Sequence, residues 1–187
     1  SIHELVCKSN NIGFSSSTVR DYWLSRLERK QKEKGFEMQL AAFVLGEKNK
    51  IEQPLRFSRQ RHTSKYLLAL HKARELFSRN PLVMNQVDSL TKLYTLLLSS
   101  GLTSFEAKHL IINGFIPLLF EKHDLKILEA QSKTISADKN RIIHLFNRKG
   151  ITIKNSLQSQ GLMEIYRQLC SHRNCLECEV GKKMLIR

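Results

Sequence analysis

Apolar residues recur at three- and four-residue intervals along most of the chain, which is the spacing of one face of an α-helix. The first stripe follows a cluster of hydroxyl side chains at residues 15–18, which can cap the start of a helix. Trp23 lies on this stripe, whereas Arg26 lies among the polar positions. We therefore predict an amphipathic helix over residues 18–34 with a basic outer face, ended by Gly35.

Later stripes predict further helices, and three local signals refine them. Thr103 and Glu106 have the spacing of a capping box, and Pro117 is expected to kink or break the helix that follows. Residues 151–154 are the one strand-like run, too short for a sheet. We therefore predict an all-α fold, an irregular bundle of about seven or eight helices in a single domain over residues 1–187. The predicted helices after the first cover residues 36–45, 66–79, 83–100, 104–121, 125–130, 137–148 and 157–170.

The composition supports this fold and limits the class of protein. The chain has 187 residues, 41% of them hydrophobic, with 8 Gly and 3 Pro, which suits a core-forming helical protein rather than a disordered tail or a large multidomain enzyme. The longest apolar stretch, residues 110–120, is shorter than the roughly 18 residues of a membrane span. No membrane partner is expected. We expect an intracellular, reducing location, in the cytoplasm or, after processing, in an organellar matrix, because no signal peptide is visible.

The charge balance indicates the partner. Lysine and arginine total 31 against 17 acidic residues, a formal net charge of +14, which favours a polyanion and nucleic acid first. A charge run is usually a solvated face, but this excess is too large for paired surface ions. Phe57 and Tyr66 lie among the most basic stretch and could stack on exposed bases, which favours RNA over DNA. The predicted contact residues are Arg56, Arg59, Arg61, Lys65, Lys72, Arg74, Arg79, Arg173, Lys182 and Lys183.

Four cysteines form the second candidate site. Cys170, Cys175 and Cys178 have the spacing C-x4-C-x2-C, and Cys7 would be the distant fourth ligand. Four thiolates satisfy either tetrahedral zinc or an iron–sulfur cluster, and three clustered ligands with a remote fourth slightly favour the cluster. Two alternatives stay open: His172 could replace Cys7 as a zinc ligand, or the thiols could bind no metal.

Three segments resemble a known family. The run QSQGLMEIYRQLCSHRNCLECEVGKKML over residues 158–185 resembles the end of the uncharacterised bacterial family called domain of unknown function 2851. LIINGFIPLLF over residues 110–120 is similar to that family's apolar helix, and Cys7 followed by WLSRLERK over residues 23–30 is similar to its earlier pattern. Residues 36–60 match poorly, and the family's nuclease-like amino-terminal region has no counterpart. The resemblance implies that the four cysteines share one site, and it implies no activity.

Nothing in the sequence supports catalysis. The acids are scattered, Glu177 and Glu179 read as surface charges, and a nucleophilic pair of Cys170 and His144 is one of many pairs that seven histidines allow. We therefore predict a non-catalytic nucleic-acid-binding protein with a structural metal site, such as an accessory subunit of a large ribonucleoprotein. The alternatives are a helical module of a nuclease-like enzyme whose catalytic core lies outside this chain, and a protein-interaction adaptor.

Overall fold

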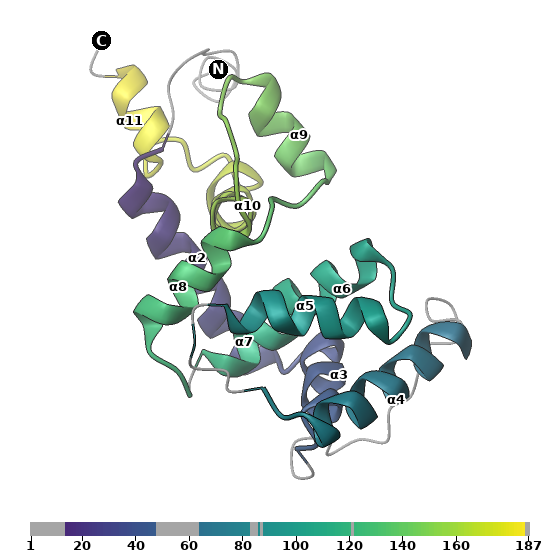
Figure 1. The fold of residues 1–187 in the computed structure, drawn as a ribbon. Coiled ribbons are helices and arrows are strands. Elements are labelled where there is room, and N and C mark those ends of the chain that lie inside the picture. The colour runs from purple at the N-terminus through teal and green to yellow at the C-terminus, as the bar shows by residue number, and fades with distance from the viewer. Residues whose placement is uncertain (1–13, 48–63, 83–85, 87, 121, 186–187) are drawn as a thin grey trace. The chain divides into compact units, whose positions relative to one another are not determined.

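The computed structural model describes residues 14–47, 64–82, 86, 88–120 and 122–185 (Figure 1). These residues form helices and one isolated bridge between Ser136 and Asn155, and they contain no strand, which confirms the all-α prediction. Counted without dividing continuous helices, the described helices number nine. In chain order the elements are α2 (Ser16–Glu33), α3 (Phe36–Val44), α4 (Ser64–Arg79), α5 (Ser89–Ser99), α6 (Ser104–Leu110), the π-helix η1 (Ile111–Phe115), α7 (Ile116–Leu119), α8 (Leu125–Thr134), α9 (Arg141–Arg148), α10 (Ser156–Ile165), the π-helix η2 (Tyr166–Cys170) and α11 (Glu179–Leu185).

The chain divides into two compact units. Unit 1 combines Ser1–Glu28 with Ser136–Arg187, and unit 2 is the intervening Arg29–Ile135. Helix α2 therefore supplies its first part to unit 1 and its last turns to unit 2. The single domain predicted over residues 1–187 stays a prediction.

Unit 1 is built on a close crossing of α2 and α10. A Cβ atom on Gly161 would lie 2.2 Å from the backbone oxygen of Val19, so only glycine lets the two helices approach this far. Trp23, one turn after Val19 on α2, is buried, with 1% of its surface exposed. The hydrophobic core of the unit consists of Val19, Trp23, Leu27, Ile143, Phe146, Leu157, Leu162, Ile165, Leu169, Cys175, Cys178 and Val180.

We predicted that Arg26 lies on the exposed outer face of α2. This prediction is wrong, because Arg26 is buried in unit 1. Its Nε donates a hydrogen bond to Gln160 Oε1, and its guanidinium lies 3.5 Å from Glu164 Oε2. Glu164 is fully buried and also accepts hydrogen bonds from Arg167 and Gln168. The polar position in the α2 pattern therefore faces a polar network on α10 rather than solvent.

Unit 2 is built around the helix that runs from α6 through η1 into α7. Here too a glycine allows close approach, because a Cβ on Gly114 would lie 2.4 Å from the backbone oxygen of Glu37 in α3. Pro117 does not break this helix. The helix widens into η1 just before Pro117, and the proline carbonyl accepts a hydrogen bond from the Gln31 side chain. The apolar side of every helix from α3 to α8 contributes to the core, including Leu40, Leu70, Leu93, Leu110, Phe115, Ile116 and Leu128.

Several helix limits differ from the predicted ones. α2 ends with Lys34 in the left-handed region, at φ 43°, so the following glycine is not the residue that reverses the chain. α5 begins at Ser89 rather than near residue 83, and α9 begins after Asn140, whose side chain caps it. The capping box of Thr103 and Glu106 is confirmed. Helix α11 was not predicted from its short run of residues.

Candidate nucleic-acid interface

The strongest predicted basic segment is only partly described. Arg56, Arg59, Arg61 and Phe57 lie outside the described residues. The remaining four predicted cations of this segment are on α4 and divide into two kinds. Lys65 and Lys72 are exposed and have no ion pair with a described residue.

The other two α4 cations already have partners. The guanidinium carbon of Arg74 lies 4.6 Å from the ring centroid of Phe43, and Arg79 forms an ion pair with Glu75 one turn earlier. A partnered cation must give up part of that interaction before it can bind a phosphate. Two of the four described cations on α4 therefore already interact with other side chains of the protein.

The stacking role considered for Tyr66 does not agree with its position. Only 8% of this side chain is exposed, so neither face of its ring can receive a base. Burial raises the pKa of the Tyr66 hydroxyl to about 12, with a smaller contribution from the nearby Glu106 carboxylate. Tyr66 is a core residue of unit 2.

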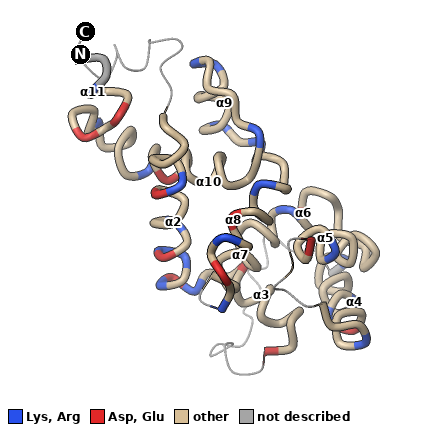
Figure 2. The backbone as a smooth tube through the Cα atoms, turned by 60° about the vertical axis from the view of Figure 1, so that its left-hand side comes forward, with Lys and Arg blue, Asp and Glu red and all other residues tan. Residues whose placement is uncertain are grey.

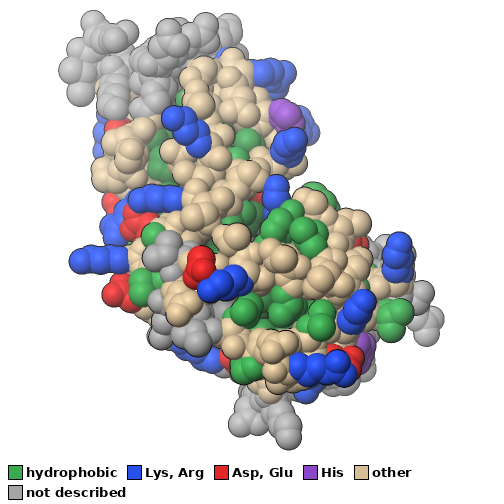
Figure 3. All heavy atoms as spheres, in the orientation of Figure 1, with side chains coloured by type: hydrophobic (Ala, Val, Ile, Leu, Met, Phe, Trp, Pro, Cys, Tyr) green, Lys and Arg blue, Asp and Glu red, His purple; other side chains and the backbone are tan. Residues whose placement is uncertain are grey.

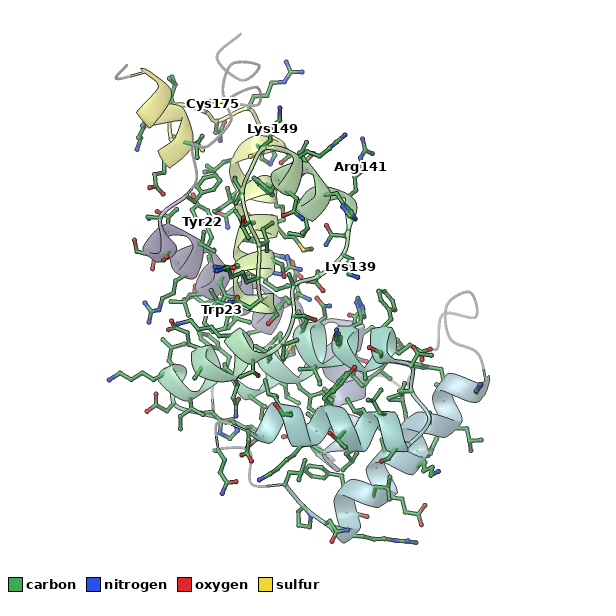
Figure 4. All side chains as sticks on the ribbon, turned by 45° about the horizontal axis from the view of Figure 1, so that its top comes forward. Tyr22, Trp23, Lys139, Arg141, Lys149 and Cys175 are labelled. Carbon is green, nitrogen blue, oxygen red and sulfur yellow. The ribbon has the colours of Figure 1, made fainter. Side chains whose placement is uncertain are left out.

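A second group of cations surrounds α9 in unit 1. We call it the α9 surface, and it consists of Lys139, Arg141, Arg148, Lys149 and Lys154. Lys149 is half-buried and the other four side chains are exposed; none of the five has an ion pair with a described residue. Basic residues follow one another along α9 and the segment after it with no acidic residue between them (Figure 2). Lys139 and Arg141 lie at one end of the helix and Lys149 at the other (Figure 4).

The local sequence explains why α9 presents these charges. Asn140 Oδ1 accepts a hydrogen bond of 3.0 Å from the Ile143 amide, which starts the helix just before Arg141. Ile143 and Phe146 are buried. Arg141 and Arg148 are two turns apart and thus share the opposite, outward face of α9.

The one acidic residue near the start of this group is occupied elsewhere. Asp138 Oδ2 accepts hydrogen bonds from the side chains of Gln160 and Ser159 in α10. The α9 surface was missed in the sequence because its cations are spread over a helix and a loop and interrupted by an apolar run. The signal that could have found it is the placement of both arginines on the polar side of that run.

The cysteine turn follows η2 directly. Cys170 is half-buried, and Cys175 and Cys178 are buried. A Cβ atom on Gly181 would lie 1.9 Å from the backbone oxygen of Cys175, so α11 folds tightly back on the turn. Among the described residues, no group of three or more His, Cys, Asp or Glu side chains is placed to hold a metal ion. The three described thiols thus do not form a ready set of ligands.

Tyr22 and Ser15 lie near this turn. The pKa of Tyr22 in α2 is raised, first by burial and then by the charges of Cys178, Glu177 and Cys170, so its hydroxyl lies near the turn. Ser15 N donates a hydrogen bond of 2.9 Å to Glu179 Oε2.

Ser15 is eight residues after Cys7, which is itself outside the described residues. The chain at Ser15 is therefore held beside the residue that follows Cys178. Of the cations predicted around the turn, Arg173 and Lys182 are exposed, and the side chain of Lys183 is outside the described part. His172, the alternative zinc ligand, is also exposed.

The search for a membrane-spanning helix and the comparisons with known proteins do not indicate a ligand for these surfaces. No described helix has both the length and the apolar character that crossing a membrane needs. No protein-family model, no curated protein and no solved structure matches the chain. The resemblance to the domain of unknown function 2851 therefore stays a prediction.

Proposed function

We propose that the protein is a non-catalytic nucleic-acid-binding protein that holds the phosphate backbone through the α9 surface, with RNA as the favoured partner. The observation that carries this proposal is the group of five neighbouring cations without an ion pair among the described residues. An accessory role in a ribonucleoprotein is the setting that suits such backbone contacts. Lys65, Lys72, Arg173 and Lys182, all exposed, are further contact residues in this proposal.

Unpaired surface cations suit phosphate binding for a physical reason. Binding them to phosphates releases condensed counterions, and the gain in free energy does not first require the loss of an existing ion pair. The Cα atoms of Arg141 and Arg148 are about 10 Å apart along α9, since a helix rises 1.5 Å per residue, so the two side chains can reach different phosphates. No base-specific contact is needed.

The test is the salt dependence of RNA binding. We expect the triple variant Arg141→Gln, Arg148→Gln, Lys149→Gln to bind a single-stranded RNA more weakly, with the slope of log Kobs against log[salt] reduced by about 2. Its matched control removes three exposed cations that have ion pairs with acids, Lys92→Gln, Lys122→Gln and Lys133→Gln. The control lowers the net charge equally, and we expect its slope to stay close to that of the unmodified protein.

Three results would contradict the proposal in different ways. An unchanged slope in the triple variant would exclude the α9 surface as the phosphate-binding site. Equal losses in the triple variant and in its control would show that net charge alone attracts RNA. Binding that does not depend on salt, or no binding of RNA or DNA at all, would favour the adaptor alternative.

A four-cysteine metal centre is the second part of the proposal, independent of the first. Cys170 is the last residue of η2, Cys175 and Cys178 lie in the segment that follows, and a hydrogen bond with Glu179 holds Ser15 beside that segment. No cysteine belongs to the α9 surface, so the two parts of the proposal can be tested separately. The centre would be an iron–sulfur cluster or zinc, and its role would be structural.

A further inference from the structure

Unit 2 carries an exposed aromatic side chain that phosphate contacts do not explain. Phe105, on the first turn of α6, has 73% of its surface exposed, the highest value among the large hydrophobic residues described. Leu68 on α4 and Leu98 on α5 are also exposed, at 70% and 38%. On the face of the molecule drawn in Figure 3, hydrophobic side chains gather over α5 and α6, with Lys and Arg at the margins. A phenylalanine exposed to this extent has a hydrophobic cost in water that a bound partner would remove.

The ring of Phe105 is held in place from one side. It stacks on His109 with an interplanar angle of 19° and a distance of 5.9 Å between ring centroids. His109 is in turn fixed, because its Nε2 lies 3.4 Å from Glu37 Oε1 and its Nδ1 lies 3.2 Å from the Asn113 amide nitrogen. The hydrogen bond with His109 is the main reason that the pKa of Glu37 is lowered to about 2. The aromatic pair is therefore preorganised, and the Phe105 ring would lose little additional freedom when a planar ligand stacks on it.

Helix α4, which packs beside the segment before α6, carries exposed cations. The Glu106 carboxylate on α6 adds to the raised pKa of Tyr66 on α4, after burial, which is the main cause. Gly101, four residues before Phe105, packs on Ala69, with 3.9 Å between the Ala69 Cβ and the place of a glycine Cβ. The exposed Lys65 and Lys72 lie one turn before and one turn after Ala69 on α4, so the helix that packs on Gly101 carries two exposed positive charges.

We propose that Phe105 is a stacking platform for an unpaired base, so that the protein binds single-stranded RNA in preference to duplex. This inference rests on the proposed function and narrows its ligand. Single strands are held by aromatic rings that stack on bases together with cations that bind the phosphates, and unit 2 carries an exposed ring on α6 and exposed lysines on α4. In a duplex each base is already stacked between its neighbours, so no base face is free to stack on Phe105.

The experiment compares three probes of the full chain at one salt concentration: a 12-nucleotide oligoadenylate, an RNA duplex of 12 base pairs, and inorganic polyphosphate, which has no bases. We expect Phe105→Ala to bind oligoadenylate about tenfold more weakly and to bind the other two unchanged. Phe105→Tyr should restore the affinity. Leu68→Ala, the matched control, removes a similarly exposed apolar side chain without an aromatic face and should have little effect.

A second readout uses the single tryptophan of the chain, Trp23, which is buried. Phe105→Trp adds an exposed fluorophore, and we expect oligoadenylate to quench it whereas polyphosphate does not. An unchanged oligoadenylate affinity in Phe105→Ala, or an equal loss in Leu68→Ala, would overturn the stacking platform. Salt-dependent binding would in that case still support the α9 surface, whereas failure of the unmodified protein to bind any of the three probes would overturn both proposals.

Discussion

The role of a charged side chain in this protein depends on what covers it. Arg26 and Arg29 lie one turn apart on α2, yet Arg26 is buried against Gln160 and Glu164, while Arg29 is partly exposed and pairs with the exposed Glu33. A buried charge that loses its partner is left uncompensated, whereas a surface pair contributes little because water replaces it. The two arginines therefore have different energetic roles.

Substituting each of them tests this difference. We expect Arg26→Ala to lower the free energy of unfolding by about 3 kcal/mol, the lower end of the range for a broken buried pair, because Arg167 still contacts Glu164. Arg29→Ala should lower it by about 0.5 kcal/mol or less. Urea denaturation followed by circular dichroism measures both, and equal changes in the two variants would show that Arg26 does not stabilise unit 1.

Single residues also show how much of the burial could be predicted from the sequence. Hydrophobic spacing predicted the buried positions Trp23 and Leu110 well, because spacing is set by the period of the helix. It also placed Tyr66 on the apolar stripe of its helix, which agrees with the burial of Tyr66 and not with the stacking role considered for it, but it did not indicate that Phe105 is exposed. Which aromatic residue faces solvent depends on the neighbouring helix, and that information is not local.

At the scale of elements, close crossings depend on glycine. In unit 1, Gly161 lets α10 approach the backbone of α2 at Val19. We expect Gly161→Ala to lower the free energy of unfolding by about 2 kcal/mol or more, because the added methyl group would meet a backbone oxygen rather than a flexible side chain. Gly35→Ala is the control, since Gly35 has a φ of −59° and its nearest atom is a Glu37 side-chain oxygen at 3.8 Å.

Thermal denaturation of the two glycine variants decides this point. Gly35→Ala should lower stability by about 1 kcal/mol or less, because Gly35 is the N-cap residue of α3, where alanine is less favourable than glycine but meets no backbone atom. If Gly161→Ala is as stable as this control, the two helices can separate without loss, and the crossing is not a stabilising contact.

Element existence was easier to predict than element limits and crossings. The stripes predicted every helix from α2 to α10, and the capping box fixed the start of α6. The π-helices η1 and η2 could not be predicted from hydrophobic spacing. One wider turn shifts the apolar pattern by only a single residue, which is within the ordinary three- and four-residue variation of a helix. The α9 surface was also missed, because its cations are not all consecutive in the sequence and come together only when α9 forms.

At the scale of the whole molecule, the metal prediction concerns both ends of the chain. A centre shared by Cys7, Cys170, Cys175 and Cys178 would close almost the whole sequence into one loop and lower the entropy of the unfolded state. We expect anaerobically purified protein to contain about one equivalent of zinc or the visible absorbance of an iron–sulfur cluster. Cys178→Ser and Cys7→Ser should each release the metal and lower Tm.

Elemental analysis and thermal denaturation of these variants distinguish the alternatives. If Cys7→Ser keeps its metal and its Tm, Cys7 is not a ligand, and His172→Ala becomes the next variant to measure. Unmodified protein without zinc or iron would contradict the metal centre and leave the thiols as packing residues of unit 1. Neither result changes the salt test of the α9 surface, because no cysteine belongs to that surface.

The division of unit 1 between two distant stretches of sequence also has a consequence for synthesis on the ribosome. Arg26 and Glu164 are 138 positions apart, so the first helix emerges long before its partner. At about 5–20 residues per second, the interval is roughly 7 to 28 s. During that time Val19, Trp23 and Leu27 have no α10 to cover them, while all of unit 2 has been translated. The nascent chain thus has a defined period in which a chaperone that binds apolar helices would protect it.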